Sequence, residues 1–201
     1  MAGVQVHTAE TAYAVTQAEI KAWNKIDSSD DDTVVALIER AVHNWAKEYT
    51  GRSLTTVTYN LFIDSIYPVD IPIKEGYYTG KEVEMNRRSL LLPFSPVSSV
   101  THFKYYDDDD TASTFASSNY FVDTVSEPAR IVLRTGASYP TGLRVANALE
   151  IRYVAGYGAT TAVPYDIKSA CLEYSAYLFE HRGDLLDGKI VSAPYSATQL
   201  L

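Results

Sequence analysis

The sequence has little of several things that would point to particular classes of protein. It contains one cysteine, Cys171, in 201 residues, so it can form no intramolecular disulfide and gives no sign of an oxidising compartment. No apolar run approaches the roughly 20 residues that a membrane-spanning helix needs. Residues 1–10 lack the basic start and apolar stretch of a signal peptide. We therefore expect a protein made in the cytoplasm, with no membrane partner.

Basic residues are also few. Lys and Arg number 17 against 25 Asp and Glu, which gives a formal net charge of −8. Binding to the phosphate backbone of nucleic acid requires clustered Lys and Arg that displace counterions. The composition therefore argues against a protein that grips DNA, although it is compatible with a surface past which DNA slides.

Motifs for catalysis and cofactor binding are absent from the sequence, including GxSxG, HExxH, GxxxxGK[ST] and GxGxxG. The four histidines, His7, His43, His102 and His181, fall in separate predicted elements without the spacing of metal ligands. Cys171 lies on the apolar stripe of a predicted helix, which favours an inert core thiol over a nucleophile. We expect no enzyme, no cofactor and no metal site.

Two acidic runs invite interpretation as cation sites. Residues 27–32 (DSSDDD) precede a predicted helix, where carboxylates complement the partial positive charge of the helix N-terminus. Residues 107–110 (DDDD) lie where a strand should turn, and consecutive side chains cannot all point at one Ca²⁺ or Mg²⁺ ion. We interpret the first run as a helix cap and the second as a solvated hairpin tip.

The unusual abundance is tyrosine, with 16 residues. Tyrosine combines a large apolar ring with a polar tip, so it suits surfaces that are wet in a monomer and dry in a complex. A strand-rich structure with half-exposed aromatic residues would explain the same number. Both interpretations stay open at this point.

Three segments have helical signals. Residues 16–26 begin with Thr16 and Glu19 in the spacing of a capping box. Residues 33–49 form the clearest helix and end at Gly51, and a third helix begins at Pro164 and ends before Gly183. The predicted buried stripes are Val34, Leu37, Ile38, Ala41 and Trp45 on the second helix, and Ile167, Ala170, Cys171, Tyr174 and Leu178 on the third.

Between these helices the periodicity changes to short alternating runs separated by turn residues. We predict strands at 54–63, 82–92, 100–106, 120–124, 130–134 and 148–154, forming an antiparallel sheet or small sandwich. The predicted fold class is α+β: a small helical bundle (residues 1–52 and 155–183) with an antiparallel β insertion (53–154). Residues 184–201 have aliphatic side chains without a helical period, which favours an extended C-terminal arm that docks on another protein over a disordered tail.

The order of these elements resembles a known family. A helix reading VVALIERAVHNWAKEYTGRSL is followed by a β region with LLLPFSPVSSVTHFKYYDDDD, and the chain continues with IRYVAGYGATTAVPYDIKSACLEYSAYLFEHRGD. The best matched pieces are YTGR at 49–52, the Pro93, Pro96 and Val97 turn, GYG at 156–158 with Val163 and Pro164, and EHR at 180–182. Together they cover most of residues 16–183, and they are similar to the head–tail connector (adaptor or head-completion) proteins of long-tailed bacteriophages and gene-transfer particles.

The resemblance implies a structural virion protein located in the neck. Such subunits form a ring, commonly of twelve, under the portal protein, extend the DNA channel, and bind the stopper or tail-completion protein. DNA would pass through the lumen without specific binding. In relatives a C-terminal arm reaches the portal, which here implies Leu185, Leu186, Ile190, Val191, Tyr195, Leu200 and Leu201.

Apolar residues outside the predicted stripes could contact neighbouring subunits. These are Val35, Val42 and Ala46 on the second helix and Tyr177 and Phe179 on the third, with a thicker core as the alternative. The long β region and the aspartate run depart from compact members of the family, so the resemblance does not indicate what that region contacts.

Other functions compete with the connector. A stopper or tail-terminator subunit would share the size and the β content, but those proteins are mainly β-barrels, and the two strong helices weigh against them. A receptor- or carbohydrate-binding β module would use the tyrosines and would need an open aromatic platform on the sheet. A hydrolase ranks last, because it would need a placed base and a donor for charge stabilisation.

Overall fold

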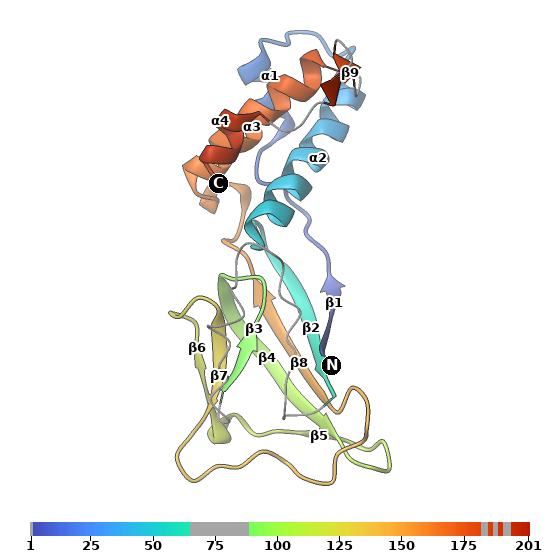
Figure 1. The fold of residues 1–201 in the computed structure, drawn as a ribbon, viewed down its shortest axis with the longest axis vertical. Helices are drawn as coiled ribbons and strands as arrows, with labels where there is room; N and C mark the ends of the chain where they lie inside the picture. The colour runs from blue at the N-terminus through green and yellow to red at the C-terminus, as the bar shows by residue number, and fades with distance from the viewer. Residues whose placement is uncertain (1, 65–88, 182–184, 187–188, 191–193) are drawn as a thin grey trace. The chain divides into compact units, whose positions relative to one another are not determined.

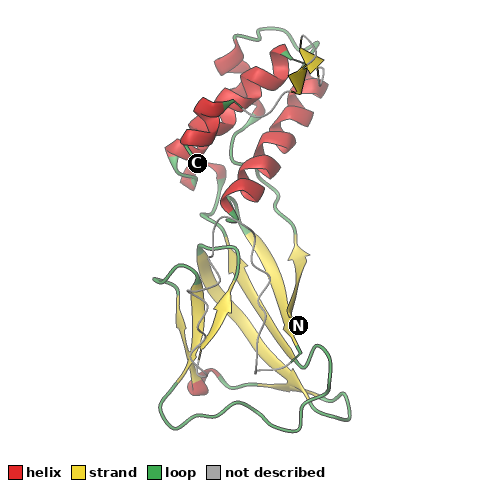
Figure 2. Ribbon diagram, viewed as in Figure 1, coloured by secondary structure: helices red, strands yellow, loops and turns green. Residues whose placement is uncertain are grey.

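The computed structural model describes residues 2–64, 89–181, 185–186, 189–190 and 194–201 (Figure 1). The chain divides into two compact units, each built from two stretches that are far apart in the sequence. The β unit comprises Met1–Glu10 and Gly51–Gly156, and the helical unit comprises Thr11–Thr50 and Tyr157–Leu201. Figure 2 shows that the strands of three residues or more gather in the β unit, whereas the α-helices gather in the helical unit. The predicted α+β class is confirmed.

The larger sheet of the β unit has five strands in the order β1-β2-β8-β4-β5, with antiparallel neighbours throughout. The strands are β1 (Ala2–Thr8), β2 (Val57–Ile63), β8 (Leu149–Ala155), β4 (Val97–Tyr106) and β5 (Ala112–Thr114). Alternating side chains of β2 and β8 are buried, as expected for strands that face a core on one side.

A smaller antiparallel sheet follows the order β3-β7-β6. Its strands are β3 (Ser89–Leu92), β7 (Ala129–Leu133) and β6 (Tyr120–Asp123), and a short 3₁₀ helix, η1 (Ser117–Asn119), leads into β6. Buried residues from both sheets form one hydrophobic cluster. The two sheets therefore share a single core, in the manner of a small sandwich.

Aromatic side chains fill much of this shared core. Phe103 on β4 is fully buried, and its ring centroid lies 5.0 Å from that of Phe115 and 5.8 Å from that of Tyr120. Tyr153 on β8 is fully buried too, and its hydroxyl donates to the carbonyl of Pro93 at 2.9 Å. The β unit thus encloses its largest rings and satisfies the polar tip of Tyr153.

The predicted strands agree well with the observed ones, although β1, β5 and two short strands of the helical unit were not predicted. The segments predicted at 54–63, 100–106, 120–124, 130–134 and 148–154 correspond to β2, β4, β6, β7 and β8. The segment predicted at 82–92 appears as β3 at its end, and residues 82–88 lie outside the described residues. Strand β1 was not predicted, and its residues 2–8 pair with β2 in the β unit instead of joining the helical bundle.

Gly156 ends β8 at a position where only glycine fits. Its φ is +112°, and a Cβ there would lie 2.0 Å from the carbonyl oxygen of Thr55. Its amide donates to the carbonyl of Pro96 at 2.8 Å. The GYG segment that carried part of the family resemblance therefore has a structural reason for its first glycine.

The helical unit contains α1 (Gln17–Asn24), α2 (Asp32–Thr50), η2 (Thr160–Ala162), α3 (Tyr165–Glu180), β9 (Leu185–Leu186), β10 (Lys189–Ile190) and α4 (Tyr195–Gln199). The two long helices, α2 and α3, pack on each other, α1 contacts both, and α4 contacts α3 (Figure 1). Among the described residues, no helix combines the length and apolarity needed to cross a membrane.

The helix ends follow the sequence signals in part. The capping box is confirmed: the Glu19 amide donates to Thr16 Oγ1 at 3.2 Å, and the Thr16 amide donates to Glu19 Oε2 at 2.7 Å. Gly51 follows α2 with φ +65°. Pro164 is the N-cap of α3, which begins at Tyr165, one residue later than predicted. The helix ends at Glu180, and Gly183 lies outside the described residues.

Candidate assembly surface

The buried stripe of α2 differs from the predicted one. Val35, Val42 and Ala46 are fully buried within the helical unit, so the prediction that Val35 and Val42 contact a neighbouring subunit is wrong. The physical reason is that α2 packs against both α1 and α3. Small side chains on the face of α2 between α1 and α3 let the three helices approach closely. Val35, Val42 and Ala46 therefore belong to the core of the helical unit, which was the alternative prediction.

Three residues that the sequence assigned to the buried stripe, Leu37, Ala41 and Trp45, lie together with Tyr49 on the flank of α2. Leu37 is 63% exposed and Tyr49 is 51% exposed, while Ala41 is exposed and Trp45 half-buried. These four residues recur at intervals of four, so they form one continuous row along the helix. The second helix thus presents an apolar row to its surroundings.

An aromatic row on α3 continues this surface. The Trp45 ring centroid lies 4.7 Å from that of Tyr174, and Tyr174 lies 6.5 Å from Tyr177, which stacks on His181 at 4.6 Å. Burial, and then the neighbouring Tyr177, raise the pKa of the Tyr174 hydroxyl above its usual value. We call the combined surface the outer seam: Leu37, Ala41, Trp45, Tyr49, Tyr174 and Tyr177.

Two further predictions for α3 have structural outcomes. Tyr177 belongs to the outer seam, and Phe179 is half-buried, so both retain surface that a partner could contact. Cys171 is fully buried, and burial raises the pKa of its thiol to about 12, as expected for an inert core cysteine.

The C-terminal segment is not wholly extended. Residues 195–199 form α4, which contacts α3, and Ala197 is fully buried there, so the prediction of an extended arm fails for this part. Tyr195 remains 77% exposed, and Leu200 and Leu201 are half-buried. Leu185 and Leu186 in β9 pair with β10, which includes Ile190, and Val191 lies outside the described residues.

On the β unit, a polar network covers the face of the large sheet opposite the core. Glu150 Oε1 lies 3.1 Å from His102 Nε2 and 3.6 Å from an Arg152 guanidinium nitrogen, and Glu150 Oε2 accepts from the Tyr106 hydroxyl at 2.7 Å. Arg152 Nε donates to Asn60 Oδ1 at 2.8 Å. Burial acts to raise the pKa of Glu150, but the hydrogen bonds from Tyr106 and His102 outweigh it, and the pKa lies below its usual value.

Sequence reasoning missed this network. Charged residues alternate with apolar ones along β8, which signals a polar outer face, but the partners come from β2 and β4 through the register of the sheet. The members of this network are bonded to one another. We therefore interpret it as structural support for the sheet face.

The aspartate run forms a turn at one end of the β unit, as predicted. Asp107 Oδ1 accepts from the amides of Asp109 at 3.1 Å and Thr111 at 2.8 Å, so the first aspartate closes the turn itself. Within the described part of the chain, no group of three or more His, Cys, Asp or Glu side chains is placed to hold a metal ion.

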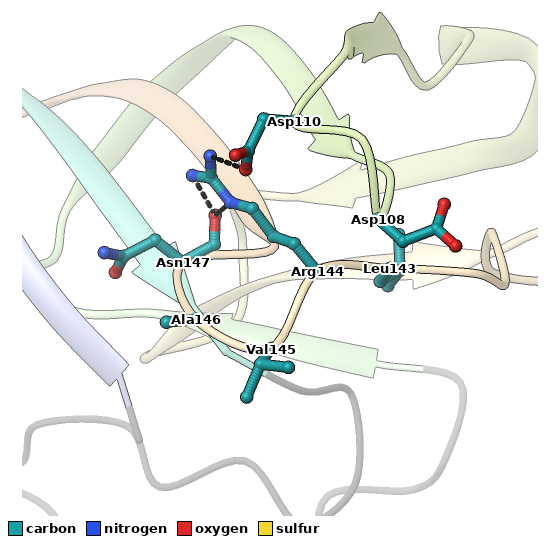
Figure 3. A pocket seen from close by; sticks show the side chains of 7 residues that line it. All are labelled: Asp108, Asp110, Leu143, Arg144, Val145, Ala146 and Asn147. Carbon is teal, nitrogen blue, oxygen red and sulfur yellow. Dashed lines mark hydrogen bonds and ion pairs between the residues drawn. The ribbon is translucent and has the colours of Figure 1, made fainter.

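An open hollow of about 480 Å³ lies between this turn and the loop before β8 (Figure 3). Arg144 crosses it, bonded to Asp110 Oδ1 at 3.3 Å and to the Asn147 carbonyl at 2.8 Å, as the dashed lines in Figure 3 show. Its guanidinium carbon lies 3.8 Å from the centre of the Tyr106 ring. Arg144 thus joins the two loops through its hydrogen bonds and its contact with the Tyr106 ring. We therefore interpret the hollow as a junction between two loops.

We compared the chain with known proteins. A scan against protein-family models matches residues 14–184 to the head completion protein family. A search of the curated proteins finds no match.

Solved structures with a similar fold come from gene transfer agent (GTA) particles. A chain in the neck of an empty GTA particle, computed with C6 symmetry, has a TM-score of 0.72 and 19% identity, with 98% of this chain and 92% of that chain covered. Chains from the virion of a native particle (TM-score 0.69) and from a native neck computed with C12 symmetry (0.65) are each 18% identical over the same shares. At these identities the likeness shows the fold.

Proposed function

Because the chain belongs to the head completion protein family, we propose that it is a structural subunit of the neck that joins the head of a phage-like particle to its tail. In this role the chain is an adaptor: copies form a ring, with twelve as the expected number, that docks under the portal protein. The ring extends the DNA channel and offers a docking surface to the stopper or tail-completion protein.

One observation carries this proposal. Nearly the whole chain, with both of its units, has the fold of subunits from GTA necks, and two of those necks were computed with C6 and C12 symmetry. A subunit in a symmetric ring needs surface that binds copies of itself, and the outer seam is such a surface. The adaptor works by contact between proteins and has no substrate.

The charge of the chain supports the proposed channel. At −8 per copy, a ring would carry a large negative charge, and we propose that this charge extends to its lumen. Negative charge repels the phosphate backbone, so DNA would pass without being held.

Sedimentation velocity of the purified protein, alone and with its portal protein, tests the adaptor role. We expect a ring, either free or formed on the portal. A monomer that stays monomeric in both experiments would contradict the role.

We also propose that the C-terminal segment binds the portal, with Tyr195 as its main contact. Tyr195 is 77% exposed, while buried Ala197 fixes the helix beneath it. Tyr195→Ala should weaken portal binding by about tenfold or more, as for aromatic anchors in other interfaces, without affecting ring formation. Tyr165→Ala is the matched control because Tyr165 is 84% exposed and begins α3. Equal portal binding by both variants would contradict this role.

A further inference from the structure

We propose that the outer seam is the surface through which one copy of this chain binds the next. It packs against the C-terminal end of α1 in the neighbouring copy, which comprises Trp23 and the turn with Asp27 and Asp30 and is called the α1 end below. This inference rests on the proposed ring. It adds which two surfaces of the helical unit close that ring.

On α2, the outer seam and α1 lie on opposite flanks. Gln17 of α1 donates to Glu39 at 3.1 Å, and Lys21 of α1 binds Asp32 at 2.6 Å, so α1 covers the side of α2 that carries these acids. Because each residue advances about 100° around a helix, Leu37 lies about 160° from Glu39. The row that begins at Leu37 therefore points away from α1.

On α3 the same separation holds. Lys168 binds Glu19 of α1 at 2.9 Å, and Asn24 of α1 donates to Ser175 at 3.4 Å. Tyr174 and Tyr177 lie on the other flank, in line with Trp45. A copy that binds another through two different flanks makes a head-to-tail contact, which generates rings, whereas a twofold contact would stop at a dimer.

The α1 end carries exposed carboxylates and an exposed aromatic ring, which complement the apolar outer seam and the cation beside it. Trp23 is 52% exposed on α1, and the turn that follows carries the exposed carboxylates of Asp27 and Asp30. On the other flank, exposed Arg40 lies one turn from Leu37. Within the described parts of the chain, neither Arg40 nor Asp30 has an ion-pair partner. An aromatic side chain with acids on one surface thus complements an apolar row with a cation on the other.

A second copy fits this surface better than a partner of another kind because both halves of the contact are on the same helical unit. Copies with a charge of −8 repel one another, so their contact needs apolar area together with local pairing of opposite charges. The outer seam and the α1 end supply both.

A first experiment places a charge on the outer seam. Leu37→Glu changes a side chain that is 63% exposed, so the fold should persist, as far-UV circular dichroism and thermal melting will check. The concentration at which the ring dissociates should rise about tenfold or more in sedimentation velocity. Val125→Glu is the matched control, since Val125 is 93% exposed in the β unit, and it should leave ring dissociation within about twofold of wild type.

A second experiment tests the pairing of the two flanks. Arg40→Asp and Asp30→Arg should each weaken the ring, and the double variant should recover most of the loss because the charges are exchanged between neighbours. Losses that simply add in the double variant would overturn the predicted contact between these two surfaces.

These results separate the inference from the proposed function. If wild type forms no ring, alone or on the portal, the adaptor role fails and the inference with it. If wild type forms a ring and Leu37→Glu forms it equally well, only the inference is overturned. The inference is also overturned if the variant keeps its ring but no longer binds the portal, because the outer seam would then be the portal surface.

Discussion

The two units of the molecule differ in where they keep their large side chains. The β unit buries its aromatic residues: Tyr59, Phe103 and Tyr153 are at most 2% exposed. The helical unit does the reverse: Val35 and Ala46 are buried, Trp45 is half-buried, and Trp23 and three tyrosines are at least half exposed. Aromatic area stabilises the fold in the first unit and remains available for binding in the second.

The charges follow the same division. In the β unit, Glu150 is bonded to His102, Tyr106 and Arg152 on the outer sheet face. In the helical unit, Arg40 and the acidic turn before α2 point outward. The comparison teaches that the β unit uses its aromatic and charged residues within its own fold, whereas the helical unit keeps exposed groups that the proposed contacts would use.

The largest expected effect is on the scaffold. Phe103→Ala should lower the free energy of unfolding by about 3–5 kcal/mol, because it leaves a cavity between two sheets that share one core. Phe121→Ala, at a position that is 55% exposed in the same unit, should cost about 0.5 kcal/mol or less. Urea unfolding of the monomer measures both. Equal losses of unfolding free energy in the two variants would contradict the conclusion that Phe103 lies in a core shared by both sheets.

The matched change in the helical unit should separate stability from assembly. Trp45→Ala removes a half-buried ring of the outer seam, so its stability loss should be smaller than that of Phe103→Ala, while ring formation should be lost. Urea unfolding and sedimentation velocity on the same preparation give both values. A variant that assembles normally but unfolds as readily as Phe103→Ala would reverse the comparison.

A smaller effect depends on pH and belongs to the β unit. Hydrogen bonds from the Ser126 side chain and backbone, together with Arg130, lower the pKa of Asp123 from 3.8 to about 2. A folded-state pKa below the unfolded one stabilises the protein above pH 3.8, and this stability is lost as pH falls towards 2. Asp123→Asn should flatten the dependence of the urea midpoint on pH in this interval, and Ser126→Ala should flatten it partly. An unchanged slope in both variants would refute the assignment.

The last prediction concerns the reactivity of Cys171, for which we expect almost no reaction in the folded protein. A fully buried thiol with a pKa of about 12 should not react with a thiol reagent at pH 8 until the helical unit unfolds. Ala41→Cys supplies an exposed thiol on the outer seam as a control, and it should react at once in the monomer and slowly in the ring. Rapid reaction of Cys171 in native protein would show that the helical core is open.

The sequence predicted local features better than the faces of the helices. The Thr16–Glu19 capping box, Gly51, and the strand alternation of β8 depend on neighbouring residues, and all three agree with the structure. The predicted stripe of α2 is correct at Ile38, which is buried, and wrong at Leu37 and Ala41, which are exposed, because periodicity alone did not place the buried face. Packing of α2 between two helices places smaller residues there instead.

Other features depended on contacts between distant residues. Strand β1 has few buried side chains and is defined by pairing with β2, whose paired residues are at least 50 positions away in the sequence. The Glu150 network depends on a register that shifts twice along β4, between Val97 and Ser99 and between Val100 and His102. Neither shift has a signal in the sequence, because bulges are set by the neighbouring strand.

An electron cryo-microscopy reconstruction of the assembled ring at side-chain resolution would test the account most directly. We predict that Leu37 and Trp45 of each copy lie within about 4.5 Å of the neighbouring copy's α1 end, with Trp23 at the centre of the contact. An outer seam that faces solvent in the ring, with copies joined only through their β units, would contradict it.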